Sequence, residues 1–482
     1  MKKDKAAQQE ARRLMMVNAP VGSVIMKMAI PTIVAFLINS IYSLADTYFV
    51  SGLGTNATAA VSVNASLDQL IMMCGSMLAV GANSYIARLL GQGDEKKASQ
   101  VLSTSFFFAA AIGLLLTIFG SIFMMPMVRL LGATPTCEGY AADYASYVLF
   151  AAPFMATSFV MNQCLRSEGS ATLSMVGMGF GGVLNCILDP LFIMGSEGLS
   201  ATYGICLPFY FPAMDVAGAS LATAISKVVS FAILIFPYIT RRSLLKLSIK
   251  NFRFNWDIIS EIISVGSSSL FRNGLAVITA ILLNDLAGNI SDSVLAGIGV
   301  CTKVMMFPFS IILGFCTGFQ PVAGFNWGAK RYDRVLKSFR FSSIVAIIGG
   351  AVMAAVLVLF ADPIIVAFAG KDPEMREIGA LSIRLQSVAL IVHGWVCVVN
   401  MLCAGLGNAG GAVVLATSRQ GSCMLPILHL STFLWGAYGI ASVQAVADVL
   451  SLALAVPIAL FMLKKIKKTQ KEYVESVIEG NV

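Results

Sequence analysis

Polar side chains recur on single helix faces in three apolar segments of this sequence. Their spacings of i, i+3, i+4 and i+7 place side chains on one side of an α-helix. The three sets are Asn39, Tyr42 and Asp46; Asn185 and Asp189; and Thr223 and Lys227. An ionisable group at membrane depth costs a few kcal/mol, so each set is a functional hypothesis.

Two chemistries fit Asp46 and Asp189 if these carboxyl groups converge. In a low-dielectric cavity the two would not both ionise readily, so one could carry a proton at physiological pH. Ionised together beside the oxygens of Asn185 and Thr223, they would instead form a hard oxygen site for Na⁺. The alternative is that each aspartate caps a helix near the membrane interface. That alternative is strongest for Asp68, whose segment offers only Asn64 on the same face.

The composition indicates that membrane-spanning helices position these residues. Hydrophobic residues make up 57% of the 482 residues and charged residues only 12%. A soluble domain carries roughly 25% charged residues, so this chain has too few to cover a water-facing surface. Apolar runs such as 101–125, 344–360 and 446–463 are long enough to cross a hydrocarbon core of about 30 Å.

The positive charges alternate between connections, which predicts the orientation. Basic clusters occur at residues 2–13, 88–97, 241–253, 330–340 and 464–471, whereas connections 51–58, 194–214, 286–293 and 436–439 lack Lys and Arg. Lys371 and Arg376 break the pattern. This positive-inside pattern predicts that both termini are cytoplasmic. The net charge of +8 does not indicate nucleic-acid binding, because the sequence has no basic face with groove-reading elements, which such binding requires.

The chain also repeats itself. Gly81, Gly91 and Lys97 recur 237 residues later as Gly318, Gly328 and Arg334, and Asn162 with Gly169 recurs as Asn400 with Gly407. The predicted spans are 22–50, 58–88, 98–126, 140–165, 171–194 and 214–240, then 257–286, 293–323, 335–360, 374–404, 411–434 and 439–463. Parallel repeats of this kind are typical of transporters, which bind substrate between the halves and expose it alternately to each side.

The predicted fold is all-α, with about twelve transmembrane helices in two homologous six-helix bundles. The predicted divisions are a cytoplasmic N-terminal segment (1–21), an N-terminal bundle (22–240), a basic linker (241–256), a C-terminal bundle (257–463) and a cytoplasmic tail (464–482).

Charges inside the spans differ between the halves. The second half carries mainly basic residues: Arg272, Lys303, Arg384 and Arg419, opposed by Asp285 and Asp448, with His393 and His429 as the only histidines. We therefore expect coupling chemistry in the first half. Pro31 removes a backbone hydrogen bond in the first span and predicts a kink there, which could respond to protonation or be passive geometry.

Five segments make the chain resemble the multidrug and toxic compound extrusion (MATE) family, and within it the MepA-like branch. The resemblance spans residues 22–463 and rests on 29–31 (AIP), 44–47 (LADT), 184–190 (LNCILDP), 216–223 (VAGASLAT) and 320–330 (QPVAGFNWGAK). It implies an antiporter that expels amphipathic, often cationic drugs in exchange for H⁺ or Na⁺, with two bundles in a V around a central cavity. It implies a monomer in the bacterial inner membrane, in contact with lipid, with no cofactor beyond the coupling ion.

On matching positions, the resemblance implies roles for individual residues. The cation or proton site, with possible Na⁺, would comprise Asp46, Asn185, Asp189 and Thr223. The substrate cavity would include Asn39, Tyr42 and Asn162, to which we add Asp68, Lys227 and Arg272, and Pro31 would mark the bend. Arg272 and Asn273 stand where some branches carry a second-half carboxylate, so a second-half cation site is not expected.

Lys227 differs from the pattern of the family that the chain resembles, because a neutral residue is expected one helical turn after Thr223. As a hypothesis, its ammonium pairs with Asp46 or Asp189 and competes with Na⁺, which favours H⁺ coupling; alternatively it extends away from the site.

A lipid-linked oligosaccharide flippase of the same superfamily is the alternative, because the basic second-half residues could hold a pyrophosphate. An enzyme is not expected, since two distant histidines supply no metal-ligand or nucleophile–base set. A channel is not expected from two unlike halves.

Overall fold

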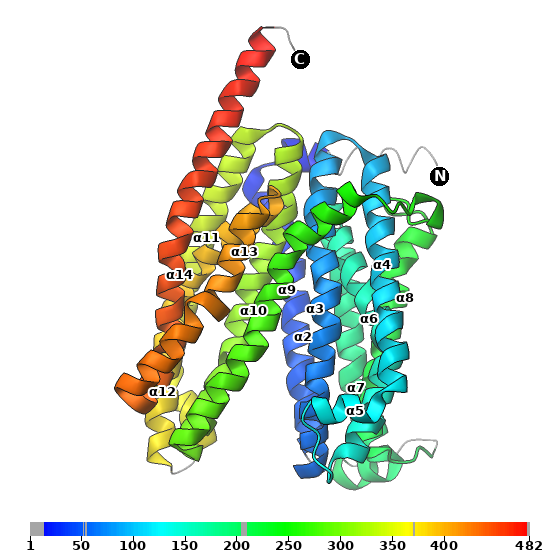
Figure 1. Cartoon of the computed structure of the whole chain (residues 1–482), viewed down its shortest axis with the longest axis vertical. Helices are drawn as coiled ribbons and strands as arrows, with labels where there is room; N and C mark the ends of the chain where they lie inside the picture. Colours follow the sequence, from blue (N-terminus) through cyan, green and yellow to red (C-terminus); the bar gives the residue numbers. More distant parts are fainter. Residues whose placement is uncertain (1–13, 52, 54, 204–209, 370–371, 480–482) are drawn as a thin grey trace. The chain divides into compact units, whose positions relative to one another are not determined.

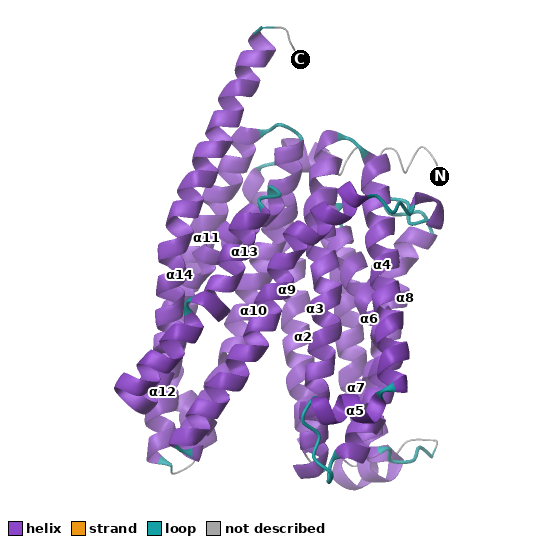
Figure 2. Ribbon diagram, viewed as in Figure 1, coloured by secondary structure: helices purple, strands orange, loops and turns teal. Residues whose placement is uncertain are grey.

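The structure is a computed structural model that describes residues 14–51, 53, 55–203, 210–369 and 372–479. Within these ranges every regular element is a helix (Figure 2). A lipid environment explains this uniformity, because backbone N–H and C=O groups in hydrocarbon must bond within their own segment. The all-α fold class predicted from the sequence is confirmed.

The helices follow one another along the chain with short connections (Figure 1). Their bounds are α2 (Val21–Ser51), α3 (Thr55–Gln92), α4 (Glu95–Ile122), α5 (Met124–Leu130), α6 (Glu138–Ser167), α7 (Ala171–Tyr203), α8 (Asp215–Ile239), η1 (Ile249–Asn251), α9 (Trp256–Ile290), α10 (Asp292–Gly328), α11 (Tyr332–Ala369), α12 (Pro373–Gly405), α13 (Ala409–Thr417), η2 (Ser418–Ser422) and α14 (Met424–Ile478).

The number of membrane spans depends on a break inside α14. In the described ranges eleven helices are long and apolar enough to cross a membrane, and the last of these, Ala409–Ile478, has 70 residues. At 1.5 Å per residue such a helix would extend about 105 Å, over three times the hydrocarbon core. Gly436 interrupts it with φ 55° and ψ −125°, outside the helical region. The break divides this stretch into two spans, in agreement with the predicted total of about twelve.

One compact unit, here called the N-terminal unit, comprises Val34–Asn83 and Glu95–Ile262. In it α6 packs against α4, α7 and α8. Small residues permit these close contacts. A Cβ on Gly113 of α4 would lie 2.4 Å from Pro153 Cα of α6, and one on Gly218 of α8 would lie 2.3 Å from the Phe192 carbonyl oxygen of α7.

The other compact unit, the C-terminal unit, comprises the described residues up to Ile33, Ser84–Asp94, and the described residues from Ile263 onward. Here α12 packs against α10, α11 and α14. The start of α2 belongs to this unit because a Cβ on Gly318 of α10 would lie 2.6 Å from Ala29 Cα. The predicted domains are consecutive ranges of the chain, whereas each compact unit combines separate segments. The predicted boundaries stay a prediction.

Equivalent residues of the two repeats make equivalent contacts. Asn162 donates its amide hydrogen to the Ser174 carbonyl oxygen at 3.1 Å, and Asn400 donates to the Ala412 carbonyl oxygen at 2.8 Å, each across 12 residues. The glycines that follow, Gly169 and Gly407, both have φ 78°. The left-handed conformation favours glycine, which explains why the repeat retains it at both positions.

The ends of α3 and α10 cross in a reciprocal contact. A Cβ on Gly91 would lie 2.1 Å from the Phe325 carbonyl oxygen, and a Cβ on Gly328 would lie 2.0 Å from the Arg88 carbonyl oxygen. Gly91 and Gly328 are repeat equivalents, and so are Arg88 and Phe325. The contact is therefore self-complementary, as expected where two parallel repeats meet about a two-fold axis.

We predict that Gly91→Ala and Gly328→Ala each destabilise the protein, because the added methyl group would overlap a backbone carbonyl that cannot rotate away. Overpacking of this kind costs about 1–3 kcal/mol. The measurement is the apparent melting temperature of purified protein in detergent. Gly349→Ala is the control, since a Cβ on Gly349 meets no atom within 4 Å. Melting temperatures equal to that of the control would contradict the reciprocal crossing.

Candidate functional site

The centre of the candidate site is a pair of hydrogen bonds between α7 and α8. The side-chain amide of Asn185 donates to Asp189 Oδ1 at 3.1 Å and to Thr223 Oγ1 at 3.2 Å. All three side chains are buried in the N-terminal unit. Asn185 and Asp189 share a face of α7 because they are four residues apart, and the packing of α7 on α8 brings Thr223 to them.

Several oxygen atoms of this site have no hydrogen-bond partner in the described chain. They are Asp46 Oδ1, Asn185 Oδ1 and Asp189 Oδ2, each buried. Asp46 interacts electrostatically with Asp189. The structure thus brings all four residues predicted for the cation or proton site into the same unit, and Asn185, Asp189 and Thr223 into direct contact. Buried acceptors without a donor are expensive, and either a proton or a cation would satisfy them.

Asp68 on α3 belongs to the same electrostatic cluster. It interacts with Asp46 and with Lys227, and its Oδ1 is buried without a hydrogen-bond partner in the described ranges. Asn64, on the same face, donates to the carbonyl oxygens of Ala60 and Ala141, at 3.0 and 2.9 Å. Asn64 therefore links α3 to α6 through a hydrogen bond. On the same face of α3, Asp68 makes no such link and belongs to the electrostatic cluster instead.

Lys227 is held by Tyr42 rather than by a carboxylate. Its Nζ donates to Tyr42 Oη at 3.4 Å and lies 4.9 Å from the centre of the Tyr42 ring, a cation–π contact. No described carboxylate forms an ion pair with Lys227, although Asp46 and Asp68 interact with it electrostatically. The hypothesis of a direct ion pair with Asp46 or Asp189 is therefore wrong for this structure. The long side chain reaches α2 one turn before Asp46, where Tyr42 supplies both a hydroxyl and a ring face.

A small cavity adjoins this cluster in the N-terminal unit. Four of the residues predicted for the substrate cavity line it, namely Asn39, Tyr42, Asn162 and Lys227. Apolar side chains that the sequence prediction missed complete the wall, among them Met155, Phe159 and Met178. Its volume of about 60 Å³ is below the roughly 300 Å³ of typical small-molecule sites. The cavity is therefore large enough for part of a ligand rather than for a whole drug-sized molecule.

Arg166 on α6 was also missed by the sequence prediction. It is 1% exposed, its Nη2 donates to Asn162 Oδ1, and its Nε donates to Ser174 Oγ at 3.0 Å. The guanidinium lies 5.6 Å from the centre of the Phe36 ring. Arg166 therefore fixes the amide of Asn162 at the cavity wall. The i, i+4 spacing of Asn162 and Arg166 was the signal that could have revealed it.

The last two predicted residues lie outside this cluster. Arg272 on α9 lines a cavity within the C-terminal unit, and its part in the substrate cavity stays a prediction. Pro31 lies inside α2, which remains one helix from Val21 to Ser51. The chain passes from the C-terminal unit to the N-terminal unit between Ile33 and Val34, just after this proline.

The chain is similar to known proteins in both sequence and fold. The multidrug export protein MepA of Staphylococcus aureus is 26% identical over 450 residues, covering 93% of this chain and 95% of MepA. MepA of Staphylococcus saprophyticus is 26% identical over 452 residues, covering 91% and 93% of the two chains. The crystal structure of a MATE protein in complex with MaL6 superposes with a TM-score of 0.86 at 22% identity, covering 94% of this chain and 99% of that one.

The family model MatE matches residues 31–191 and 269–427, one segment in each repeat. These segments include the site residues of α2, α3, α6 and α7 described above. The chain is therefore a multi-pass membrane protein that belongs to the MatE family.

Proposed function

We propose that this chain is a secondary multidrug exporter, which exchanges amphipathic, cationic compounds for H⁺ or Na⁺, with H⁺ favoured, by alternating access. The observation that carries the proposal is the cluster of buried, unpartnered carboxylate oxygens on Asp46, Asp68 and Asp189, beside a cavity lined by Tyr42 and Phe159. Carboxylates and aromatic rings together recognise an organic cation. The relatives named multidrug export protein support export of drugs.

The charge of Lys227 favours a proton over a sodium ion. The amide nitrogen of Asn185 faces Asp189 Oδ1 and Thr223 Oγ1, which leaves Asn185 Oδ1 without a partner in the described chain. A bound Na⁺ needs oxygen ligands, and this oxygen could supply one beside Asp46 and Asp189. The ammonium of Lys227 interacts electrostatically with Asp46 and would compete with such a metal cation.

We predict that Asp46→Asn and Asp189→Asn each reduce dye efflux to background, because an amide cannot take up and release a proton. The measurement is efflux of a fluorescent cationic dye from proteoliposomes, with a pH gradient and a Na⁺ gradient imposed separately. Asp333→Asn is the matched control, since that carboxylate is 51% exposed and forms an ion pair with Lys337. We expect the pH gradient to drive efflux. No dye movement under either gradient, with folded wild-type protein, would overturn the proposal and favour the flippase alternative.

We predict that Lys227→Met makes the Na⁺ gradient a more effective driving force. Removing the ammonium takes away a positive charge that acts on Asp46 and Asp68, and so weakens the competition against a metal cation. The same proteoliposome assay measures this change, with Lys337→Met as the control because its side chain is 73% exposed. Unchanged dependence on Na⁺ in Lys227→Met would rule out competition by the lysine.

A further inference from the structure

Two adjoining cavities lie inside the C-terminal unit. Their volumes are about 240 and 580 Å³, and both are lined by Phe309, Arg419 and Gln420. The larger one falls within the roughly 300–1,000 Å³ of small-molecule sites. Its apolar wall includes Met305, Met306 and Leu283. These cavities are thus better suited in size to a whole organic ligand than the cavity of the N-terminal unit.

The charged groups at these cavities are all basic. Arg272 lines the smaller cavity, Lys303 lines the larger one, and Arg419 lines both, while no Asp or Glu is among the described lining residues. Arg272 donates to Ser269 Oγ at 3.3 Å, and neither Arg272 nor Lys303 forms an ion pair within the described chain. Cations inside a membrane protein are normally paired, so the half-buried, unpaired Arg272, with the exposed Lys303 at the adjoining cavity, predicts an anionic ligand.

A short π-helix presents Arg419 to both cavities. The π-helix η2 (Ser418–Ser422) follows α13 directly, and it turns the consecutive residues Arg419 and Gln420 to the same wall. Thr279 of α9 donates to the Gln420 carbonyl oxygen at 2.5 Å, which satisfies a backbone group of this irregular turn. Single π-helical turns within α-helical regions occur frequently at functional sites.

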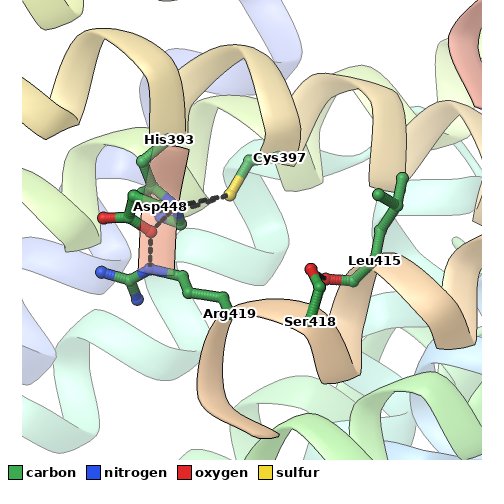
Figure 3. Close-up of polar contacts among 6 residues, drawn as sticks. All are labelled: His393, Cys397, Leu415, Ser418, Arg419 and Asp448. Atoms are coloured by element: carbon green, nitrogen blue, oxygen red, sulfur yellow. Dashed lines mark hydrogen bonds and ion pairs between the residues drawn. The ribbon is translucent and has the colours of Figure 1, made fainter. Parts of the chain in front are cut away.

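The guanidinium of Arg419 is held in place by two neighbours. Its Nε donates to Asp448 Oδ1 at 2.6 Å, and its Cζ lies 4.3 Å from the centre of the Phe309 ring. Figure 3 shows Arg419 and His393 converging on Asp448, with His393 Nδ1 at 3.7 Å from the same carboxylate oxygen. Arg419 Nη2 is buried without a hydrogen-bond partner in the described ranges, and so is the amide nitrogen of Gln444 on the larger cavity. Both atoms are donors.

We propose that the cavities of the C-terminal unit bind an amphiphile that carries an oxyanion, a carboxylate or a phosphate. Arg272 and Arg419 bind the oxyanion, Lys303 adds long-range attraction, and Phe309 with the methionines contacts the apolar body. Asp448 is a positioning residue that fixes the Nε edge of Arg419. The ligand chemistry is the opposite of that proposed for the N-terminal cavity, and it could belong to a free organic anion or to an anionic lipid headgroup.

We predict that wild-type protein in nanodiscs of phosphatidylcholine binds pyrenebutyrate more tightly than pyrenebutanol, which has the same apolar body without the oxyanion. Arg419→Gln combined with Asp448→Asn removes the positive charge of the guanidinium without leaving a buried carboxylate unpaired, and we expect it to weaken pyrenebutyrate binding by about tenfold or more. Arg272→Gln tests the second donor independently. Arg384→Gln is the control, because that arginine is 46% exposed and paired with Asp362.

Adding phosphatidylglycerol to the nanodiscs distinguishes the two sources. Displacement of pyrenebutyrate would identify the site as one for an anionic lipid headgroup, and retained binding would identify it as one for a free organic anion. Equal binding of pyrenebutyrate and pyrenebutanol by wild-type protein would overturn the proposal. So would unchanged pyrenebutyrate affinity in Arg272→Gln and in the double variant, with melting temperatures showing that the variants are folded.

Discussion

The lack of hydrogen-bonding partners in hydrocarbon determines most of this structure. It requires helices, because only a helix satisfies the backbone within one segment. It also requires that polar side chains find partners inside the protein, as Asn162 does with the Ser174 carbonyl oxygen and Arg166, and Ser230 does with the Gly177 carbonyl oxygen. Against this background, buried polar atoms that lack partners stand out. Those of Asp46 and Asp189 are acceptors, and that of Arg419 is a donor.

The two repeats provide the same scaffold with opposite charge. Equivalent asparagines, Asn162 and Asn400, make equivalent bonds, and equivalent glycines, Gly91 and Gly328, make a reciprocal contact. Gene duplication therefore preserved the residues that satisfy the backbone and allow helices to approach. The charged residues at and near the cavities diverged. In the N-terminal unit Lys227 lines the cavity and Asp46 and Asp68 interact with it, whereas Arg272, Lys303 and Arg419 line the cavities of the C-terminal unit.

Sequence periodicity predicted the features that depend on one helix. The spans follow from apolar length, and the shared face of Asn185 and Asp189 follows from their spacing, so both could be predicted. Features that depend on how helices pack could not. The contact of Lys227 with Tyr42 joins residues 185 positions apart, and a flexible lysine can extend in several directions. The ion pair of Arg419 with Asp448 joins residues 29 positions apart. It depends on the π-helix η2, which no pattern of residues in the sequence predicts.

The proposed exchange needs only competition within the N-terminal unit. Asp46, Asp68 and Asp189 share one electrostatic environment, in which a change of charge on one carboxylate acts on the others. A cationic drug near Tyr42 would therefore favour the ionised carboxylates, and protonation of a carboxylate would weaken binding of the drug. Linkage makes these two effects equal in size. Under the proposed function, antiport then requires that the drug and the proton reach the same cluster from opposite sides of the membrane. It does not require a signal carried between distant sites, which agrees with the confinement of the carboxylates to one unit.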